Sequence, residues 1–364
     1  MNLDFDASRW GRVREDYRRW WAGDLDRPLI HLTLTGRDPG RPEPALPSYE
    51  FTSFYDLDIP AEAIVDRWLY NQECRKFVGD AFPHVLPNFG PGVIAALMGL
   101  ELHNGADTVW FHPKQPLDLE DVQFEFDPHN RWFRRLCDLY QTATDRFEGL
   151  IHVDVTDLGG NMDILASFRP GERLLMDLYD DPDRVVALTD QAHDMWWRYF
   201  EELNQIIQVG HPGYTAWTPI YSEDPYYMLQ CDFCYMISPE MFEQFVKPEL
   251  HATCKKLANP FYHLDGPGQL NHIGSLLEID ELKGVQWVPG AGQAGVTGWP
   301  EVYRKIRDAG KRIQFFTSQD EHGMGTLDLI AGQLGSAEGI IMIGEVPVEQ
   351  EPEVQTLLAR YRAM

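Results

Sequence analysis

The sequence is poor in cysteine, in basic residues and in long apolar runs. Five cysteines occur among 364 residues, at positions 74, 137, 231, 234 and 254. This odd number, in a chain that opens Met-Asn-Leu-Asp-Phe-Asp without an apolar leader, is typical of reduced thiols. We therefore expect a cytoplasmic protein rather than a secreted disulfide scaffold.

The shortage of basic residues limits the classes of partner. Lys and Arg number 31 against 57 Asp and Glu, which gives a net charge of −26. Such a charge disfavours binding to nucleic acid or to an anionic membrane surface. No apolar run approaches the ~18 residues that a membrane-spanning helix needs. We expect a small-molecule substrate instead, with a homodimer as the expected assembly.

Short apolar strands alternate with helical segments from residue 29 to the end. Alternation of this kind predicts parallel strands, and eight units favour a single-domain (β/α)8 TIM barrel over residues 1–364. Residues 1–26 would be an N-terminal helical extension, 60–79 a helix, and 93–147 an excursion after the second strand. An open doubly wound sheet is disfavoured because no Gly-x-Gly-x-x-Gly follows the first strand. Strands are expected near residues 29, 82, 150, 213, 261, 284, 312 and 339.

One stretch carries the strongest sign of chemistry. A short apolar run ends on His263, and Asp265 follows two residues later, before Gly-Pro-Gly. Residues i and i+2 of a strand point to the same face, so both side chains can aim at one point. The pair suits a metal or acid–base site. The alternative is structural: His263 bonds a nearby loop, and Asp265 caps the turn.

In a barrel, functional residues gather at the carboxyl ends of the strands. No lysine stands at such a position, which argues against Schiff-base chemistry, and Cys231-x-x-Cys234 lacks the second pair of a zinc site. Asp157, Asp154 and Asp163 are the expected catalytic carboxylates, with Asp154 or Asp163 as general base. The expected substrate-binding residues are His31, Arg37, Asn88, Asn161, Trp217, Tyr221, Gln286 and Trp287.

Several motifs make the chain resemble a known superfamily. They are Asp157–Gly160, Ile237–Phe242, Phe245–Pro248 and Tyr262–Gly266. On these motifs the sequence resembles the uroporphyrinogen decarboxylase-like superfamily, which includes corrinoid-linked zinc methyltransferases and, more distantly, cobalamin-independent methionine synthase. Within it, the chain resembles uncharacterised members labelled as trimethylamine corrinoid proteins.

The resemblance implies a metal site and methyl transfer. The methyltransferases bind zinc through His-x-Cys after strand five and a Cys after strand eight, and the matching positions here hold His263, Asp265 and Glu345. Carboxylates are harder ligands than thiolates, so zinc is expected with manganese or iron as alternatives. The enzyme would move a methyl group between a small methylated compound, or a methyl-corrinoid on a partner protein, and an acceptor. Asp157 and Asn161 would orient the substrate.

Two other functions stay open. The first is a decarboxylase acting on a carboxylated aromatic compound or a tetrapyrrole, which would need Arg37 in the pocket. An acidic chain with so few arginines near the first strand is a poor host for a polycarboxylate. The second is a non-catalytic barrel that binds a corrinoid or another ligand.

Overall fold

The computed structural model describes residues 1–363 and centres on one mostly parallel sheet. The seven strands follow the order β2-β1-β11-β10-β9-β8-β7, and every neighbouring pair is parallel except β1 with β2. The predicted mixed α/β class is therefore confirmed. The strands are β1 Leu29–Thr35, β2 Arg75–Gly79, β7 Tyr226–Gln230, β8 Asn259–Asp265, β9 Gly284–Val288, β10 Arg312–Phe316 and β11 Ile340–Pro347.

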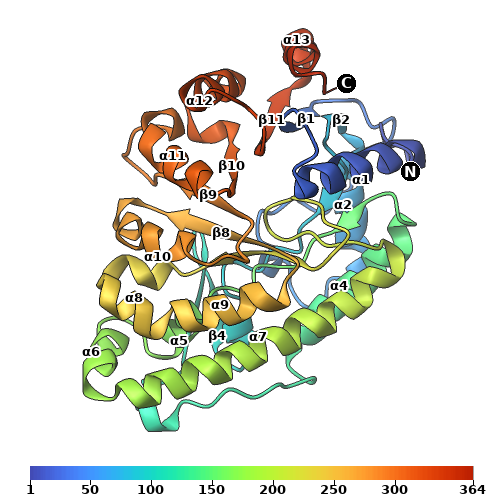
Figure 1. Ribbon diagram of the computed structural model, residues 1–364. Helices are drawn as coiled ribbons and strands as arrows, with labels where there is room; N and C mark the ends of the chain where they lie inside the picture. Colours follow the sequence, from blue (N-terminus) through green and yellow to red (C-terminus); the bar gives the residue numbers. More distant parts are fainter. Residues whose placement is uncertain (364) are drawn as a thin grey trace.

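Helices cover the outer side of this sheet (Figure 1). Ser238 caps the start of one of them: its hydroxyl accepts the Met241 N–H at 3.3 Å, and Pro239 occupies the first turn. The helices are α1 Ala7–Ala22, α2 Ala61–Glu73, α3 Ile94–Leu97, α4 Arg131–Phe147, α5 Asn161–Phe168, α6 Arg173–Asp180, α7 Pro182–Gly210, α8 Pro239–Phe245, α9 Lys247–Lys256, α10 Ile273–Leu277, α11 Pro300–Asp308, α12 Thr326–Leu334 and α13 Glu351–Tyr361. No helix in residues 1–363 is long and apolar enough to cross a membrane.

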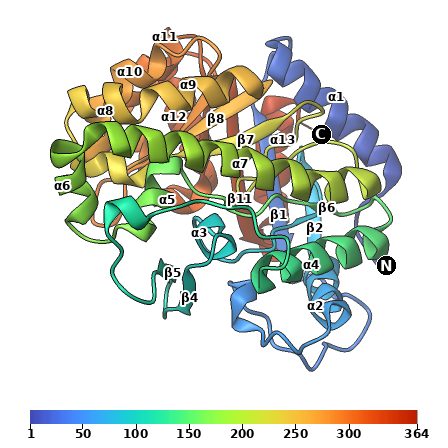
Figure 2. The ribbon, with the colours of Figure 1, turned by 90° about the horizontal axis from the view of Figure 1, so that it is seen from below.

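Two small sheets complete the fold. A parallel pair joins β3 (His84–Val85) to β6 (His152–Val153), and an antiparallel hairpin joins β4 (Glu101–Asn104) to β5 (Val109–His112). The hairpin falls in the segment expected to be an excursion. It lies at the edge of the molecule away from α10 and α11 (Figure 2).

The expected closed TIM barrel is not confirmed. Within residues 1–363, the hydrogen-bonded ladders run from β2 to β7 and separately through β3 and β6, and they do not close. The strands β3 and β6 have only two residues each, and Pro83 and Pro87 flank β3. Proline lacks the N–H that a ladder needs, so pairing beyond these residues is interrupted.

Two expected elements were wrong, and one of them bears on the site. The expected strand near residue 213 forms only an isolated bridge between Tyr214 and Ser222, and the fourth main parallel strand is β7 instead. The expected helix over 60–79 ends at Glu73, where the chain turns into β2 and pairs antiparallel with β1. Because the strand is 226–230, its carboxyl end lies beside Asp232.

Candidate functional site

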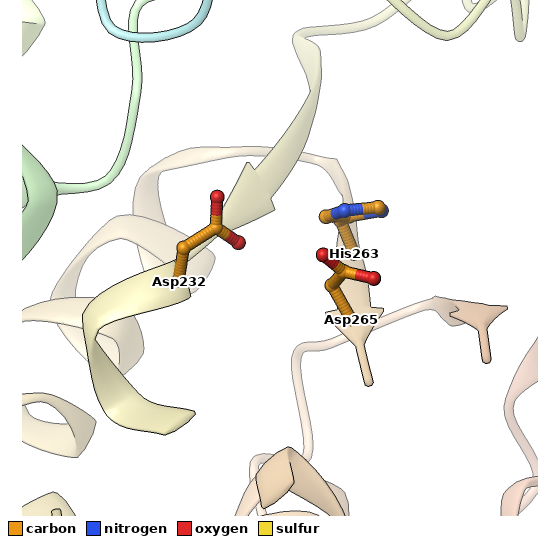
Figure 3. A group of neighbouring side chains, drawn as sticks. All are labelled: Asp232, His263 and Asp265. Carbon is orange, nitrogen blue, oxygen red and sulfur yellow. The ribbon is translucent and has the colours of Figure 1, made fainter. Parts of the chain in front are cut away.

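Three side chains meet at the carboxyl ends of β7 and β8. Asp232, His263 and Asp265 each offer one ligand atom, and these atoms all lie within 4.8 Å of one another (Figure 3). His263 and Asp265 project from one face of β8, as the i, i+2 spacing predicts. Asp232 begins the 3₁₀ helix that follows β7. Since β7 and β8 are parallel neighbours, their ends bring the three residues together.

Buried amides orient His263. Its Nδ1 hydrogen-bonds Gln286 Oε1, and Gln286 Nε2 donates in turn to Gln314 Oε1. The three residues occupy one row across β8, β9 and β10, and both glutamines are fully buried. An accepting Oε1 places the proton of the imidazole on Nδ1. The other nitrogen, Nε2, is thereby left available to bind a metal, an arrangement common around metal-binding histidines.

The donor set of this group fits a divalent metal. One imidazole nitrogen and two carboxylates suit zinc, manganese or iron(II). Desolvation raises the pKa of Asp232, while the neighbouring His263 lowers it and the neighbouring Asp265 raises it. Asp232 is exposed, and His263 and Asp265 are half-buried, so a metal and a substrate can both reach the group.

A cavity of about 440 Å³ adjoins Asp232. Its wall combines residues from the β4–β5 hairpin, including Trp110 and His112, with Asp163 of α5. Asp163 accepts the backbone N–H groups of Asp232 and Phe233 at 3.0 and 2.7 Å, so it also holds Asp232 in place. Burial, followed by the charge of Asp232, raises the pKa of Asp163 to about 8. This carboxyl therefore faces the cavity largely protonated near neutral pH.

Asp157 lies behind the same cavity. Its Oδ1 accepts the Gly159 N–H at 2.8 Å and Gln230 Nε2 at 3.3 Å, and Gln230 lines the cavity. Burial raises the pKa of Asp157 to about 7, although the Gly159 hydrogen bond opposes the rise. Asp157 thus acts on the cavity through Gln230.

The third expected metal ligand lies elsewhere. Glu345, on β11, forms an ion pair with Arg75 at 2.8 Å and does not join His263 and Asp265. The ligand set that the geometry supports therefore contains Asp232 in place of Glu345. Glu345 lines a second cavity of about 510 Å³, to which His31 also contributes. Asp154 is bound to His84, which lines this second cavity too.

Of the three aromatic residues expected to line the pocket, one contacts the site and two lie in the core. The Trp217 ring packs edge-on against His263 at 5.1 Å between centroids. Tyr221 is buried among core aromatic rings, with its hydroxyl donating to the Pro212 carbonyl. Trp287 is fully buried against Trp299 on the face of β9 opposite Gln286.

The remaining residues that were expected to bind substrate form hydrogen bonds within the fold instead. Asn161 donates to Glu249 at 2.6 Å, and Asn88 accepts the Gly90 N–H within a turn. Arg37 bonds Asn2 and the Glu73 carbonyl, away from either large cavity.

Sequence reasoning missed Asp232, Gln314 and His84. The signal for Asp232 was available, because Tyr-Tyr-Met-Leu-Gln at 226–230 is rich in aromatic residues and precedes it directly. Placing the strand near 213 instead concealed it. The signal for Gln314 was weaker, since only the strand register aligns it with Gln286.

Comparison with known proteins shows a shared fold. The chain resembles the structure of a methyltransferase from Methanosarcina mazei with a TM-score of 0.61 and 14% sequence identity, covering 96% of this chain and 98% of that one. A methyltransferase-type fold is confirmed at this level. The superfamily assignment and the trimethylamine label stay predictions. No family model matches the sequence, and no curated protein matches it.

Proposed function

We propose that this protein is a metal-dependent enzyme of the methyltransferase type. The observation that carries the proposal is the group Asp232, His263 and Asp265, with its ligand atoms within 4.8 Å and His263 oriented by a buried glutamine. The fold likeness to a methyltransferase supports methyl transfer among the chemistries such a group can serve. Zinc is the first candidate metal, and manganese and iron(II) are the alternatives.

The residues divide the work as follows. His263, Asp265 and Asp232 hold the metal, which when bound supplies a Lewis acid that activates a coordinated group. Trp217 and the aromatic side chains of the β4–β5 hairpin confine the substrate next to these ligands. Asp163 holds a proton near neutral pH and lines the cavity, so it suits a general acid better than the general base expected from sequence.

With a small methylated donor, the bonds, electrons and protons of the methyl transfer are accounted for as follows. The bond between the methyl carbon and its leaving atom breaks, and its electron pair stays on the leaving atom. Asp163 gives its proton to that atom, while a lone pair of the acceptor forms the new bond to carbon. A thiol acceptor reacts as its thiolate, having lost its own proton to solvent beforehand. A methyl-corrinoid donor, carried by a partner protein, would keep the pair on the corrinoid and need no proton from Asp163.

Elemental analysis tests the metal. The purified protein is expected to hold about one metal ion per chain, and the His263→Ala/Asp265→Ala double variant is expected to hold none. Glu345→Ala is the matched control, because that carboxylate pairs with Arg75 and should leave the metal content unchanged. A metal-free wild type, or metal loss in Glu345→Ala only, would refute this site.

Turnover tests the chemistry. The metal-loaded protein is incubated with methylcobalamin or a methylated amine, with a thiol as acceptor, and the methylated thiol is measured. Formation that disappears in the double variant supports methyl transfer. Cobalamin that is bound without turnover would favour the ligand-binding alternative. The decarboxylase alternative lacks support, because neither lysine nor arginine lines either of the two large cavities described in residues 1–363.

A further inference from the structure

A second pair of His and Asp lies outside the metal group. Asp154 follows β6 directly, and its carboxylate accepts His84 Nδ1 at 2.6 Å and the Thr215 hydroxyl at 2.5 Å. The Asp154 side chain is 1% exposed, whereas His84 is 23% exposed. The carboxylate is thus sealed from solvent while the imidazole is not.

The backbone around this pair is tightly held. The Tyr140 hydroxyl donates to the Asp154 carbonyl at 3.1 Å and accepts the Thr156 N–H at 2.8 Å. Burial raises the pKa of Asp154, while His84 and then Thr215 lower it. Asp154 therefore has two fixed donors, and one of them, His84, reaches the second cavity.

The second cavity is lined by residues of β1, β3 and β11 and by the segment at the carboxyl end of β10. Beside His84 the lining includes the buried His31, whose Nδ1 lies 3.2 Å from the Tyr17 hydroxyl and whose ring centroid is 5.8 Å from that of His84. Burial, and then His84, lowers the pKa of His31 well below its usual value, so His31 stays neutral. The rest of the wall is mixed: Thr33, Thr317 and Ser318 supply hydroxyls, and Phe316, Met324 and Ile343 are apolar.

We infer that His84, held by Asp154, is the general base of a second site, which binds a small neutral or cationic molecule carrying an O–H, N–H or S–H group. Asp154 fixes the proton on Nδ1 and leaves Nε2 free to accept one, the arrangement by which a buried carboxylate activates a histidine. The ligand's X–H bond breaks, its electron pair stays on X, and an Nε2–H bond forms. The positive charge on the imidazole is then balanced by Asp154.

The lining decides the charge of the ligand. Glu345 is the one carboxylate of the described lining, and neither lysine nor arginine belongs to that lining. Arg75 lies outside the lining and is already paired with Glu345, so no unpaired basic side chain in the lining is available to an anion, and the chain as a whole carries −26. The inference does not depend on the metal, because His84 and Asp154 hydrogen-bond none of the three proposed ligands within residues 1–363.

Carbethoxylation with diethyl pyrocarbonate tests the base. This small neutral reagent acylates unprotonated imidazole nitrogen, and mass spectrometry of the digested protein gives a rate for each of the 12 histidines. With EDTA present, we expect His84 to react about 10-fold faster than the exposed His129. In Asp154→Asn the rate at His84 should fall to that of His129 or below, while His129 is unchanged.

A second variant covers a failure of Asp154→Asn to fold. Ser318 is exposed and lines the cavity, so Ser318→Trp should obstruct entry and slow the reaction at His84 several-fold without touching the pair. A wild-type His84 no faster than His129, or a rate unchanged by Asp154→Asn in a variant with normal thermal unfolding, overturns the inference.

A further experiment tests the charge of the ligand at the second site. Choline chloride, a cation that carries an O–H group, is expected to slow carbethoxylation of His84, and sodium sulfate at equal ionic strength is not. Protection by sulfate alone would overturn the assignment of a neutral or cationic ligand. None of these readouts involves methyl transfer, so a failure here is separable from a failure of the proposed function.

Discussion

The two His–Asp groups of this protein use the same side chains in opposite environments. At the ends of β7 and β8, His263 stands with two carboxylates that solvent can reach, and its Nδ1 is bonded to an amide. Between β3 and β6, His84 stands with one carboxylate that is fully buried and bonded to a hydroxyl as well. Accessible carboxylates keep lone pairs for a metal, whereas a buried, fully bonded carboxylate can only orient its partner. Burial therefore separates the proposed ligand set from the proposed proton-transfer pair.

The largest expected effect is a dependence of the free energy of unfolding on pH, caused by the buried carboxyl groups. Burial raises the pKa of Asp157 to about 7 from its usual value of 3.8. Between these values the unfolded chain has lost the proton and the folded chain keeps it, so the free energy of unfolding falls as pH rises from about 4 to 7. The loss amounts to at most about 4 kcal/mol. Urea unfolding in EDTA measures it, and Asp157→Asn should flatten the slope. An equally steep slope in that variant contradicts the assignment.

Truncating a carboxylate should affect stability in one group and not in the other. Asp154→Ala removes the partner of His84 and Thr215 in the core, and we expect it to cost about 3 kcal/mol. Asp265→Ala, at a half-buried strand end, should cost less than about 1 kcal/mol without metal. Urea unfolding of both variants in EDTA checks the comparison. Equal costs would show that burial does not separate the groups.

Metal binding should stabilise through one group only. At about 100 times its dissociation constant, zinc should add about 2.7 kcal/mol to the free energy of unfolding of the wild type. The increase should vanish in His263→Ala and persist in His84→Gln. Thermal unfolding with and without zinc measures it. If zinc no longer stabilised His84→Gln, the metal would bind at His84 and not at the proposed site.

The smallest expected effect concerns Gln286, the buried amide that hydrogen-bonds His263. Gln286→Leu removes the hydrogen bond that sets the His263 ring, and metal affinity should fall about 10-fold, or about 1.4 kcal/mol. Competition with a chromogenic chelator measures the affinity. Gln230→Leu is the control, since Gln230 bonds Asp157 and not His263. A similar loss in both variants would rule out a specific role for Gln286.

Much of the fold was predictable because strand and helix periodicity is local. Residues 284–288 and 312–316 form the strands expected there. The strand near 213 failed because its apolar residues lie between Pro212 and Pro219, and local pattern does not show where a ladder closes. Because the strand was expected near 213 and not at 226–230, its carboxyl end was misplaced and Asp232 was not recognised as a site residue.

The sequence by itself determined the alternation of strands and helices and the pairing of His263 with Asp265, since an i, i+2 spacing on a strand leaves no other arrangement of the two side chains. Only the tertiary structure decided their partners. Asp232 replaces Glu345 because β7 is the hydrogen-bonded neighbour of β8, while β11 carries Glu345 to Arg75. His84 meets Asp154 because β3 pairs with β6 across 70 residues. Strand order is a property of the whole packed core, and no local pattern encodes it.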